Sequence, residues 1–423
     1  MSAAEQSGGA GSTETNRPPP LQGIRVLDLS RVLAGPWAGQ LLADLGADVV
    51  KVERPQVGDD TRAWGPPYLK DEAGQDTTQA TYFLCANRNK RSVTIDMATA
   101  EGQALIRRLA AEADVVLENF KCGGLVQYGL DYASLRAINP RLVYCSITGF
   151  GQTGPYAARP GYDALIQGMG GLMSVTGRAD SEEGAGPQKV GVALTDIMTG
   201  LYATIAVQAA LTERARSGLG QQIDLALLDV QIACMANQAS AYVAGGVVPR
   251  RMGNAHPSIV PYQDFPTADG DMILAVGNDS QFAKFCEVAC HGEWATDERF
   301  ATNPLRVANR SVLIPLIRQT TVLRTTREWV SLLEARGVPC GPINRLDDVF
   351  ADMQVRSRGT RIELPHAEAG RVALVANPIR LSDSPVQYRL PPPTLGQHTA
   401  DVLGQWLTLD AEAISALRAA QVI

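Results

Sequence analysis

The chain has 423 residues, of which 45% are hydrophobic and 19% charged, and a formal net charge of −6. This is the composition of a soluble globular protein of about two domains, and its negative charge gives no support to nucleic-acid binding. No run of about eighteen apolar residues is present, so we expect no membrane span.

Seven cysteines are scattered along the chain without a CxxC pair, which favours a reducing cytoplasm. Cys286, Cys290 and His291 lie about one helical turn apart, but no second ligand cluster accompanies them. We therefore interpret them as one face of a buried helix and expect no metal site. Residues 1–20 are rich in Gly, Ser, Thr and Pro and lack the apolar core of a secretory signal, so we expect a disordered leader.

The first ordered segments alternate between strand and helix. The sequence IRVLDL (24–29) predicts a buried strand, and a helix that opens with Pro36 and ends at Gly46 follows it. The next strand is expected at 47–52. Further strands at 93–96, 115–118 and 142–147, with a helix at 101–113, continue the alternation. The pattern predicts a doubly wound α/β domain with a parallel sheet.

A strand, a turn, a helix and then Glu53 resemble a dinucleotide-binding fingerprint. The turn reads RVLAGP (31–36) and lacks the glycines of GxGxxG that let a pyrophosphate approach the backbone. A nicotinamide-dependent dehydrogenase is therefore only a distant alternative.

Asp196 precedes a long apolar helix expected at 197–215, with small and apolar residues on nearly every face. Such a helix should be buried. Free backbone N–H groups and the helix dipole favour negative charge in its first turn. Two interpretations remain open at this point: a capping acid, and a nucleophilic carboxylate placed where an oxyanion is also stabilised.

The character of the sequence changes between about 225 and 330. Residues 223–230 predict a strand that leads into a helix ending near 244. Two strands at 262–265 and 272–276 flank Asp269–Gly270, a tight-turn signal for an antiparallel hairpin. Helices are expected around 280–289 and 310–316. We predict a smaller α+β domain over 225–330 and a larger domain whose first part covers 21–224.

Several segments, taken in order, resemble the family III CoA-transferases, the group that includes formyl-CoA transferase. They are PLQGIRVLDLSRVLAGP (20–36), LGADVVKVERP (45–55), NKRS (89–92), ENF (118–120), SITGFGQTGP (146–155), GYDALIQGMGGLMSVTG (161–177), GVALTDIMTG (191–200), GVPCGPIN (337–344) and LGQHT (395–399). Two further segments, MGNAHPSIVPYQDF (252–265) and TNPLRVANR (302–310), resemble the branch that transfers CoA from succinyl-CoA to dicarboxylates such as glutarate.

The resemblance implies a Rossmann-like large domain built from both chain ends, with 331–423 returning to it, and two subunits interlocked as a homodimer. It places the family nucleophile on Asp196. The carboxylate would attack an acyl-CoA to give an aspartyl anhydride and then an aspartyl-CoA thioester. With a reference pKa near 3.9, we expect Asp196 to be ionised at neutral pH without a base. The chemistry implies a CoA thioester as substrate and no permanently bound cofactor.

The resemblance also implies a set of CoA contacts. They are Leu33, Ala34, Arg54, Ile95, Met97, Ala98, Asn119, Phe120, Lys121, Arg159 and Tyr162. For each of them alone, strand packing or a solvated charge is an equally simple interpretation. Lys90 and Arg91 are further candidates for phosphate contacts.

A stiff loop, HPSIVP (256–261), stands where formyl-CoA transferase has a glycine-rich loop. We expect His256, with Arg250 or Arg251, to neutralise the distal carboxylate of a dicarboxylic substrate; a surface charge and a loop histidine are the plain alternative.

Racemases of 2-methylacyl-CoA thioesters share the fold and use a His where this chain has Tyr162. A phenol is a poor base at neutral pH, so Tyr162 is expected to donate a hydrogen bond to the substrate, and Asp163 to be structural. The racemase and a noncatalytic CoA-binding protein remain the alternatives to a transferase.

Overall fold

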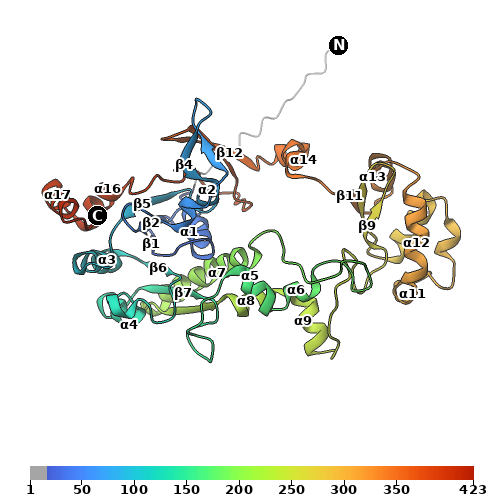
Figure 1. Cartoon of the computed structure of the whole chain (residues 1–423), viewed down its shortest axis with the longest axis horizontal. Helices are drawn as coiled ribbons and strands as arrows, with labels where there is room; N and C mark the ends of the chain where they lie inside the picture. The colour runs from blue at the N-terminus through green and yellow to red at the C-terminus, as the bar shows by residue number, and fades with distance from the viewer. Residues whose placement is uncertain (1–16) are drawn as a thin grey trace, which may run out of the picture. The chain divides into compact units, whose positions relative to one another are not determined.

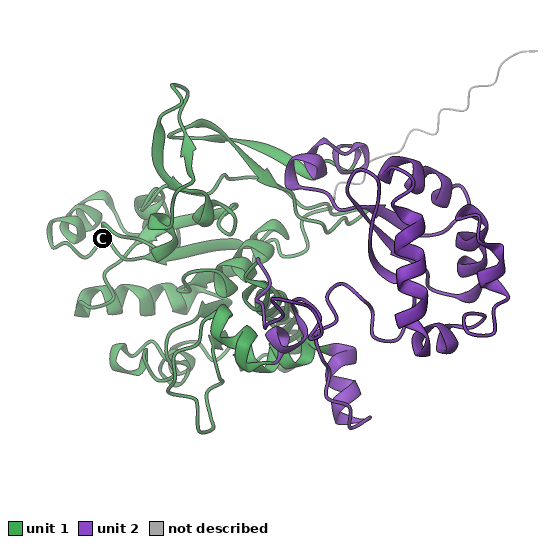
Figure 2. Cartoon of the chain, turned by 45° about the vertical axis from the view of Figure 1, so that its right-hand side comes forward, with its two compact units in different colours: residues 1–170, 192–235, 358–423 green, residues 171–191, 236–357 purple. Residues whose placement is uncertain are grey.

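The computed structural model describes residues 17–423, so most of the leader expected at 1–20 lies outside the described residues. Contacts within the chain divide it into two compact units (Figure 2). The described part of unit 1 covers 17–170, 192–235 and 358–423, and unit 2 covers 171–191 and 236–357. The domain limits expected near 225 and 330 stay a prediction beside these contact-based limits.

A six-stranded parallel sheet forms the centre of unit 1 (Figure 1). Its order is β5-β2-β1-β6-β7-β8, and all five neighbouring pairs are parallel. The strands are β1 (Arg25–Asp28), β2 (Asp48–Glu53), β5 (Lys90–Thr94), β6 (Val115–Glu118), β7 (Val143–Thr148) and β8 (Gln222–Ala226). The predicted α/β class with a parallel sheet is confirmed.

Helices cover both faces of this sheet, which is why its strands read as nearly continuous apolar runs. The core on one face includes Leu27 and Val116 from the strands, and Leu105, Leu135 and Trp406 from helices. The core on the other face includes residues of α1, α5, α7 and α8. The helices of unit 1 are α1 (Ala34–Asp44), α2 (Thr81–Leu84), α3 (Ala100–Glu112), α4 (Tyr132–Ile138), α5 (Asp163–Met169), α7 (Leu194–Ser217), α8 (Leu227–Cys234), α16 (Thr399–Leu407) and α17 (Ala411–Ala419).

Helix α7 is buried on one face only, so the expectation that it is buried all round is wrong. Its inward side packs so closely on α1 that a Cβ on Gly200 would lie 2.8 Å from the carbonyl oxygen of Ala34. Leu201, Tyr202 and Ile205 are exposed, Ile205 by 63%. Within residues 17–423, α7 is the one helix whose length and composition would allow a membrane span, a property that core helices of globular proteins share.

Two hairpins of unit 1 were not predicted. They are β3 (Tyr68–Lys70) with β4 (Asp76–Ala80), and β12 (Arg361–His366) with β13 (Gly370–Val375). Phe83, Leu84, Val372 and Leu374 form a small core between these segments. The hairpins therefore bring a segment near residue 80 together with one near residue 370.

Unit 2 contains a three-stranded antiparallel sheet of order β11-β10-β9. The hairpin of β9 (Tyr262–Pro266) and β10 (Asp271–Ala275) confirms the turn predicted at Asp269–Gly270. Cys286 lies in the aromatic core beside this sheet, whereas Cys290 is exposed and, with His291, follows the end of α10 (Asp279–Val288). The expectation that the three residues form one face of a buried helix is therefore wrong for Cys290 and His291. The remaining elements are α6 (Leu172–Val175), α9 (Ala236–Val243), α10 (Asp279–Val288), α11 (Asn303–Ala308), α12 (Arg310–Thr321), α13 (Thr326–Glu334), β11 (Cys340–Pro342), α14 (Leu346–Ala351) and α15 (Met353–Ser357).

Candidate active site

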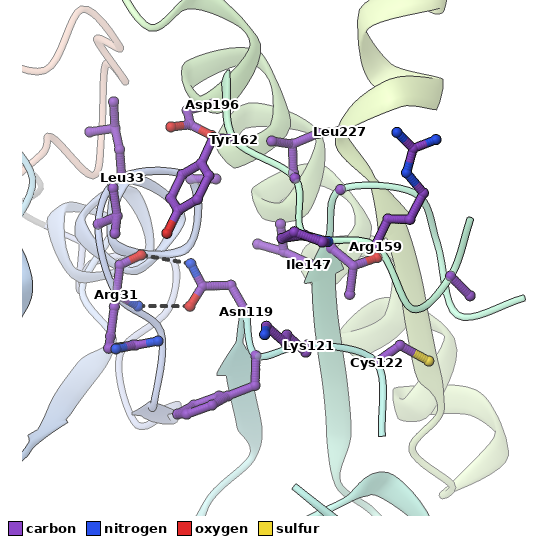
Figure 3. Close-up of a pocket in the computed structure, with 18 of the residues that line it drawn as sticks. Arg31, Leu33, Asn119, Lys121, Cys122, Ile147, Arg159, Tyr162, Asp196 and Leu227 are labelled. Atoms are coloured by element: carbon purple, nitrogen blue, oxygen red, sulfur yellow. Dashed lines mark hydrogen bonds between the residues drawn. The ribbon is translucent and has the colours of Figure 1, made fainter. Parts of the chain in front are cut away.

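A cavity of about 160 Å³ opens at the carboxyl ends of β1, β6 and β7 (Figure 3). In parallel sheets this edge is where ligands bind. Its lining includes eight of the residues expected from the sequence: Leu33, Ala34, Asn119, Phe120, Lys121, Arg159, Tyr162 and Asp196. We call it the Asp196 cavity. The fold brings together segments that lie more than 160 residues apart in the chain.

Asp196 lies in the first turn of α7 but does not cap it. The N-cap residue is Ala193, and it has no side-chain cap bond. Asp163, the first residue of α5, caps the start of α7 instead. Its Oδ1 accepts hydrogen bonds from the backbone N–H of Thr195 at 2.8 Å and of Asp196 at 3.3 Å. Its Oδ2 accepts from Gln167 Nε2 at 2.7 Å. The Asp196 carboxylate therefore remains available at the cavity wall.

Burial and the neighbouring carboxylate of Asp163 raise the pKa of Asp196 to about 7. The expectation of a fully ionised Asp196 at neutral pH is therefore wrong, because it used the value for a carboxylate in water. Burial, followed by the charge of Asp196, also raises the pKa of the Tyr82 phenol to about 12. Tyr82 therefore stays protonated at neutral pH.

A second cavity of unit 1, of about 250 Å³, contains the other expected CoA contacts. Arg54, Ile95, Met97 and Ala98 line it, together with Phe120. We call it the Met97 cavity. Between them, the two cavities include all eleven residues that the family resemblance assigned to CoA.

Lys90 and Arg91 do not line either cavity, so the interpretation of them as phosphate contacts finds no support. Lys90 Nζ is fully buried and donates to Asp28 Oδ2 at 2.9 Å and to the carbonyl oxygen of Pro36 at 2.8 Å. Burial lowers the pKa of Lys90 to about 8. Arg91 forms an ion pair with Asp48. Both side chains hold the sheet and the start of α1 in place.

The loop between β1 and α1 is held in a strained conformation by a buried ion pair. Val32 is β-branched and has φ +70°, which is costly unless the surroundings enforce it. Its N–H donates to both carboxylate oxygens of Asp59 at 3.3 Å. Asp59 pairs with Lys51 Nζ at 2.8 Å, and Lys51 also donates to the carbonyl oxygen of Ser30. Sequence reasoning did not single out Lys51, although a lysine inside the apolar segment VVKV (49–52) is a signal that could have indicated this network.

His256 and Arg251 belong to unit 2, where their side chains have different surroundings. His256 lines a cavity of about 290 Å³ together with Arg250. Its Nδ1 accepts from the Ser258 N–H at 3.0 Å, which leaves the hydrogen on Nε2 in the neutral ring. Arg251 forms an ion pair with Asp180 and does not line this cavity.

The segment TNPLRVANR (302–310) fixes the loop that carries His256. Arg310 donates to the carbonyl oxygen of His256 at 3.1 Å. Asn303 Oδ1 accepts from the Val260 N–H at 3.1 Å. The two segments that resembled the dicarboxylate branch in the sequence are thus one structural assembly within unit 2.

No group of three or more His, Cys, Asp and Glu is arranged to hold a metal ion within residues 17–423.

Comparison with known families gives a match to the sequence profile of CoA-transferase family III over residues 21–399. The chain belongs to CoA-transferase family III. Asp196 and both cavities therefore lie in the part of the chain that the family shares.

Two proteins named as CoA-transferases are similar to this chain over nearly its whole length. The succinate–glutarate CoA-transferase of Agrobacterium fabrum is 53% identical over 398 residues, which cover 94% of this chain and 98% of that protein. The human succinyl-CoA:glutarate CoA-transferase is 42% identical over 415 residues, covering 98% and 92% of the two chains.

Two solved structures have the same fold as this chain. A CaiB/BaiF family protein from Brucella suis is 53% identical and superposes with a TM-score of 0.81 over 92% of this chain and all of that one. Rv3272 from Mycobacterium tuberculosis, at 32% identity, gives a TM-score of 0.79 over 91% and 99% of the two chains.

Sequence reasoning missed three residues of the site. Asp163 was treated as a structural residue with no stated contact, whereas it caps α7 at the candidate nucleophile. Arg31 and Asp60 line both cavities and were not singled out. Arg31 lies inside the RVLAGP turn (31–36), but no motif indicated its salt bridge with Asp60, which lies 29 residues further along the chain.

Proposed function

We propose that the protein transfers CoA from succinyl-CoA to glutarate or a similar dicarboxylate through covalent catalysis by Asp196. The observation that carries the proposal is the position of Asp196, a half-buried carboxylate at a helix start on the wall of a cavity in the shared part of the family. The printed activities of relatives at 42–53% identity support the donor and the acceptor.

The proposed reaction exchanges acyl bonds without ATP. The Asp196 carboxylate attacks the succinyl thioester, the C–S bond breaks, and a succinyl–aspartyl anhydride and CoA thiolate form. The thiolate attacks the aspartyl carbonyl, which releases succinate and leaves an aspartyl-CoA thioester. Glutarate attacks this thioester and expels CoA thiolate again. The thiolate then attacks the glutaryl carbonyl, which gives glutaryl-CoA and frees Asp196.

The pKa of Asp196, near 7, suits this transfer reaction. Asp196 must be ionised to attack, and a carboxylate that is poorly stabilised by water is a stronger nucleophile for the thioester. Asp163 would act as a positioning residue, because it fixes the start of α7 and raises the pKa of Asp196 at the same time. We assign to Tyr162, which is 67% exposed on the cavity wall, a hydrogen bond to the thioester oxygen.

For CoA, we propose that the thiol end occupies the Asp196 cavity and the nucleotide end the Met97 cavity. For the dicarboxylates, we propose that His256 contacts the distal carboxylate. Arg250 is better suited than Arg251 to assist it, because Arg250 lines the His256 cavity while Arg251 is already neutralised by Asp180.

We also propose an interlocked homodimer in the cytoplasm, with no permanently bound cofactor. The exposed apolar side chains of α7 support an association with a second copy, since unpaired apolar patches mark interfaces. Light scattering at several protein concentrations tests this, with a dimer mass expected throughout; a monomer mass throughout would reject it.

The experiment that tests the function is an acceptor panel with succinyl-CoA, read as new acyl-CoA by chromatography. Glutarate should be converted, and Asp196→Asn and Asp196→Ala should reduce turnover on the order of a thousandfold or more. Asp271→Asn, at an exposed position in β10, is the matched control and should keep native turnover. Retained turnover in either Asp196 variant would reject the covalent route, and deuterium uptake at the α-carbon of a 2-methylacyl-CoA without an acceptor would indicate a racemase.

A further inference from the structure

Three residues of unit 1 line both the Asp196 cavity and the Met97 cavity: Arg31, Asp60 and Phe120. Arg31 Nη1 lies 3.2 Å from Asp60 Oδ2. The same guanidinium lies over the Phe120 ring, 5.3 Å from its centroid. The junction between the two cavities is therefore a salt bridge that lies against an aromatic ring.

The backbone beneath this salt bridge is firmly held. Asn119 binds both polar groups of the Arg31 backbone: its Oδ1 accepts from the N–H at 2.8 Å and its Nδ2 donates to the carbonyl oxygen at 2.6 Å (Figure 3). On the other side, Asp59 is buried and accepts from the Val32 N–H. The residues next to Arg31 and Asp60 are thus fixed. The side chains of Arg31 and Asp60 themselves are about half exposed, at 49% and 45%.

The ion pair between Arg31 and Asp60 is weak enough for a phosphate group to displace Asp60. An exposed ion pair between single side chains stabilises a protein very little. A guanidinium binds phosphate oxygens through two charge-assisted hydrogen bonds, which are stronger. Within residues 17–423, Asp60 is the one carboxylate in ion-pair contact with Arg31. A phosphate that enters the junction would therefore replace Asp60 as the partner of Arg31.

CoA carries its pyrophosphate between the pantetheine arm and the nucleotide. If the thiol end lies in the Asp196 cavity and the nucleotide in the Met97 cavity, the pyrophosphate must cross the junction. We propose that Arg31 binds this pyrophosphate, and that Asp60 holds the Arg31 guanidinium at the junction until the phosphate replaces it. This inference rests on the proposed function and adds a phosphate-binding residue and its competing carboxylate.

Two opposite effects follow from the exchange. Arg31→Gln removes the phosphate partner but leaves the backbone bonds to Asn119 in place. Asp60→Asn removes both the competitor and a negative charge that repels phosphate. The first substitution should therefore weaken the use of CoA thioesters, and the second should strengthen it.

The test compares kcat and KM for three donors: succinyl-CoA, its 3′-dephospho form, and succinyl-pantetheine, which has no phosphate. Arg31→Gln should raise KM about tenfold for the first two donors with little change in kcat, and should leave kcat/KM for succinyl-pantetheine unchanged. Arg31→Lys keeps the positive charge but lacks the paired N–H donors of a guanidinium, so its KM for these two donors should lie between those of the native protein and Arg31→Gln. Asp60→Asn should lower KM for the first two donors about threefold.

The matched controls are Arg336→Gln and Glu287→Gln, which break an exposed ion pair of 3.2 Å in unit 2 and should change nothing. The inference is overturned if Arg31→Gln affects succinyl-pantetheine as strongly as succinyl-CoA, if its effect disappears with the dephospho donor, or if Asp60→Asn raises KM. Absence of transfer from any donor by the native protein would instead reject the proposed function, and CoA binding measured by calorimetry on the same variants would then decide the role of Arg31 separately.

Discussion

Replacing Asp196 by Asn should stabilise the folded protein, and more strongly at pH 8 than at pH 5. The reason is the raised pKa of Asp196, which moves from 3.8 to about 7 on folding. Between these two values the unfolded chain has released the proton while the folded protein retains it. Folding therefore becomes less favourable as the pH rises from about 4 to about 7, and the cost stays constant above that.

The size of the effect follows from the shift. Each pKa unit corresponds to about 1.4 kcal/mol, so the raised pKa of Asp196 destabilises the folded state by at most about 4 kcal/mol at pH 8 and about 2 kcal/mol at pH 5. Water in the cavity screens part of this cost because the carboxylate is only half-buried. We therefore expect Asp196→Asn to gain about 1–2 kcal/mol more at pH 8 than at pH 5.

Urea unfolding of both proteins, followed by far-UV circular dichroism at the two pH values, measures this difference. Asp271→Asn, on an exposed surface, is the control and should change stability equally at both pH values. An equal gain for Asp196→Asn at both pH values, or a loss at pH 8, would refute the reasoning that links burial to the pKa of Asp196.

Three further predictions concern the same region. The kcat/KM for succinyl-CoA should rise with pH and level off above about 7, because only ionised Asp196 attacks; a pH–rate profile that is flat through 7 would contradict this. Lys51→Met should destabilise the protein by about 3–5 kcal/mol because it leaves Asp59 buried without its partner; an unchanged melting temperature would show that the pair is dispensable. Gly200→Ala should cost about 1–3 kcal/mol, since the new Cβ would meet the Ala34 carbonyl oxygen at 2.8 Å, and calorimetry that shows no loss would mean that α7 and α1 adjust freely.

The parallel sheet could be predicted from the sequence because its strands carry strong local signals. The strand predicted at 115–118 coincides with β6 (Val115–Glu118), and those predicted at 47–52 and 142–147 are β2 and β7 shifted by one residue. Apolar runs covered on both faces, separated by helices of period 3.6, identify such strands without tertiary information. The β3–β4 and β12–β13 hairpins could not be found in this way, because their small core joins segments almost 300 residues apart.

Prediction of the site depended on the kind of interaction involved. The cavity linings follow the segments that carried the family resemblance, including Leu33 and Asn119. The pKa of Asp196 and its support by Asp163 could not be read from the sequence, because both depend on which groups surround the carboxylate once α5 and α7 pack. The exposed face of α7 was mispredicted for a related reason: apolar residues on all sides indicate burial, but a single chain need not supply every covering surface.

Trapping of the intermediate on Asp196 tests the central claim most directly. The protein would be incubated with succinyl-CoA, quenched with hydroxylamine, digested and analysed by mass spectrometry. The account predicts an aspartyl hydroxamate at Asp196, formed from the activated carboxyl group, and its absence in Asp196→Asn. An unmodified Asp196 in a protein that is turning over would contradict the covalent mechanism.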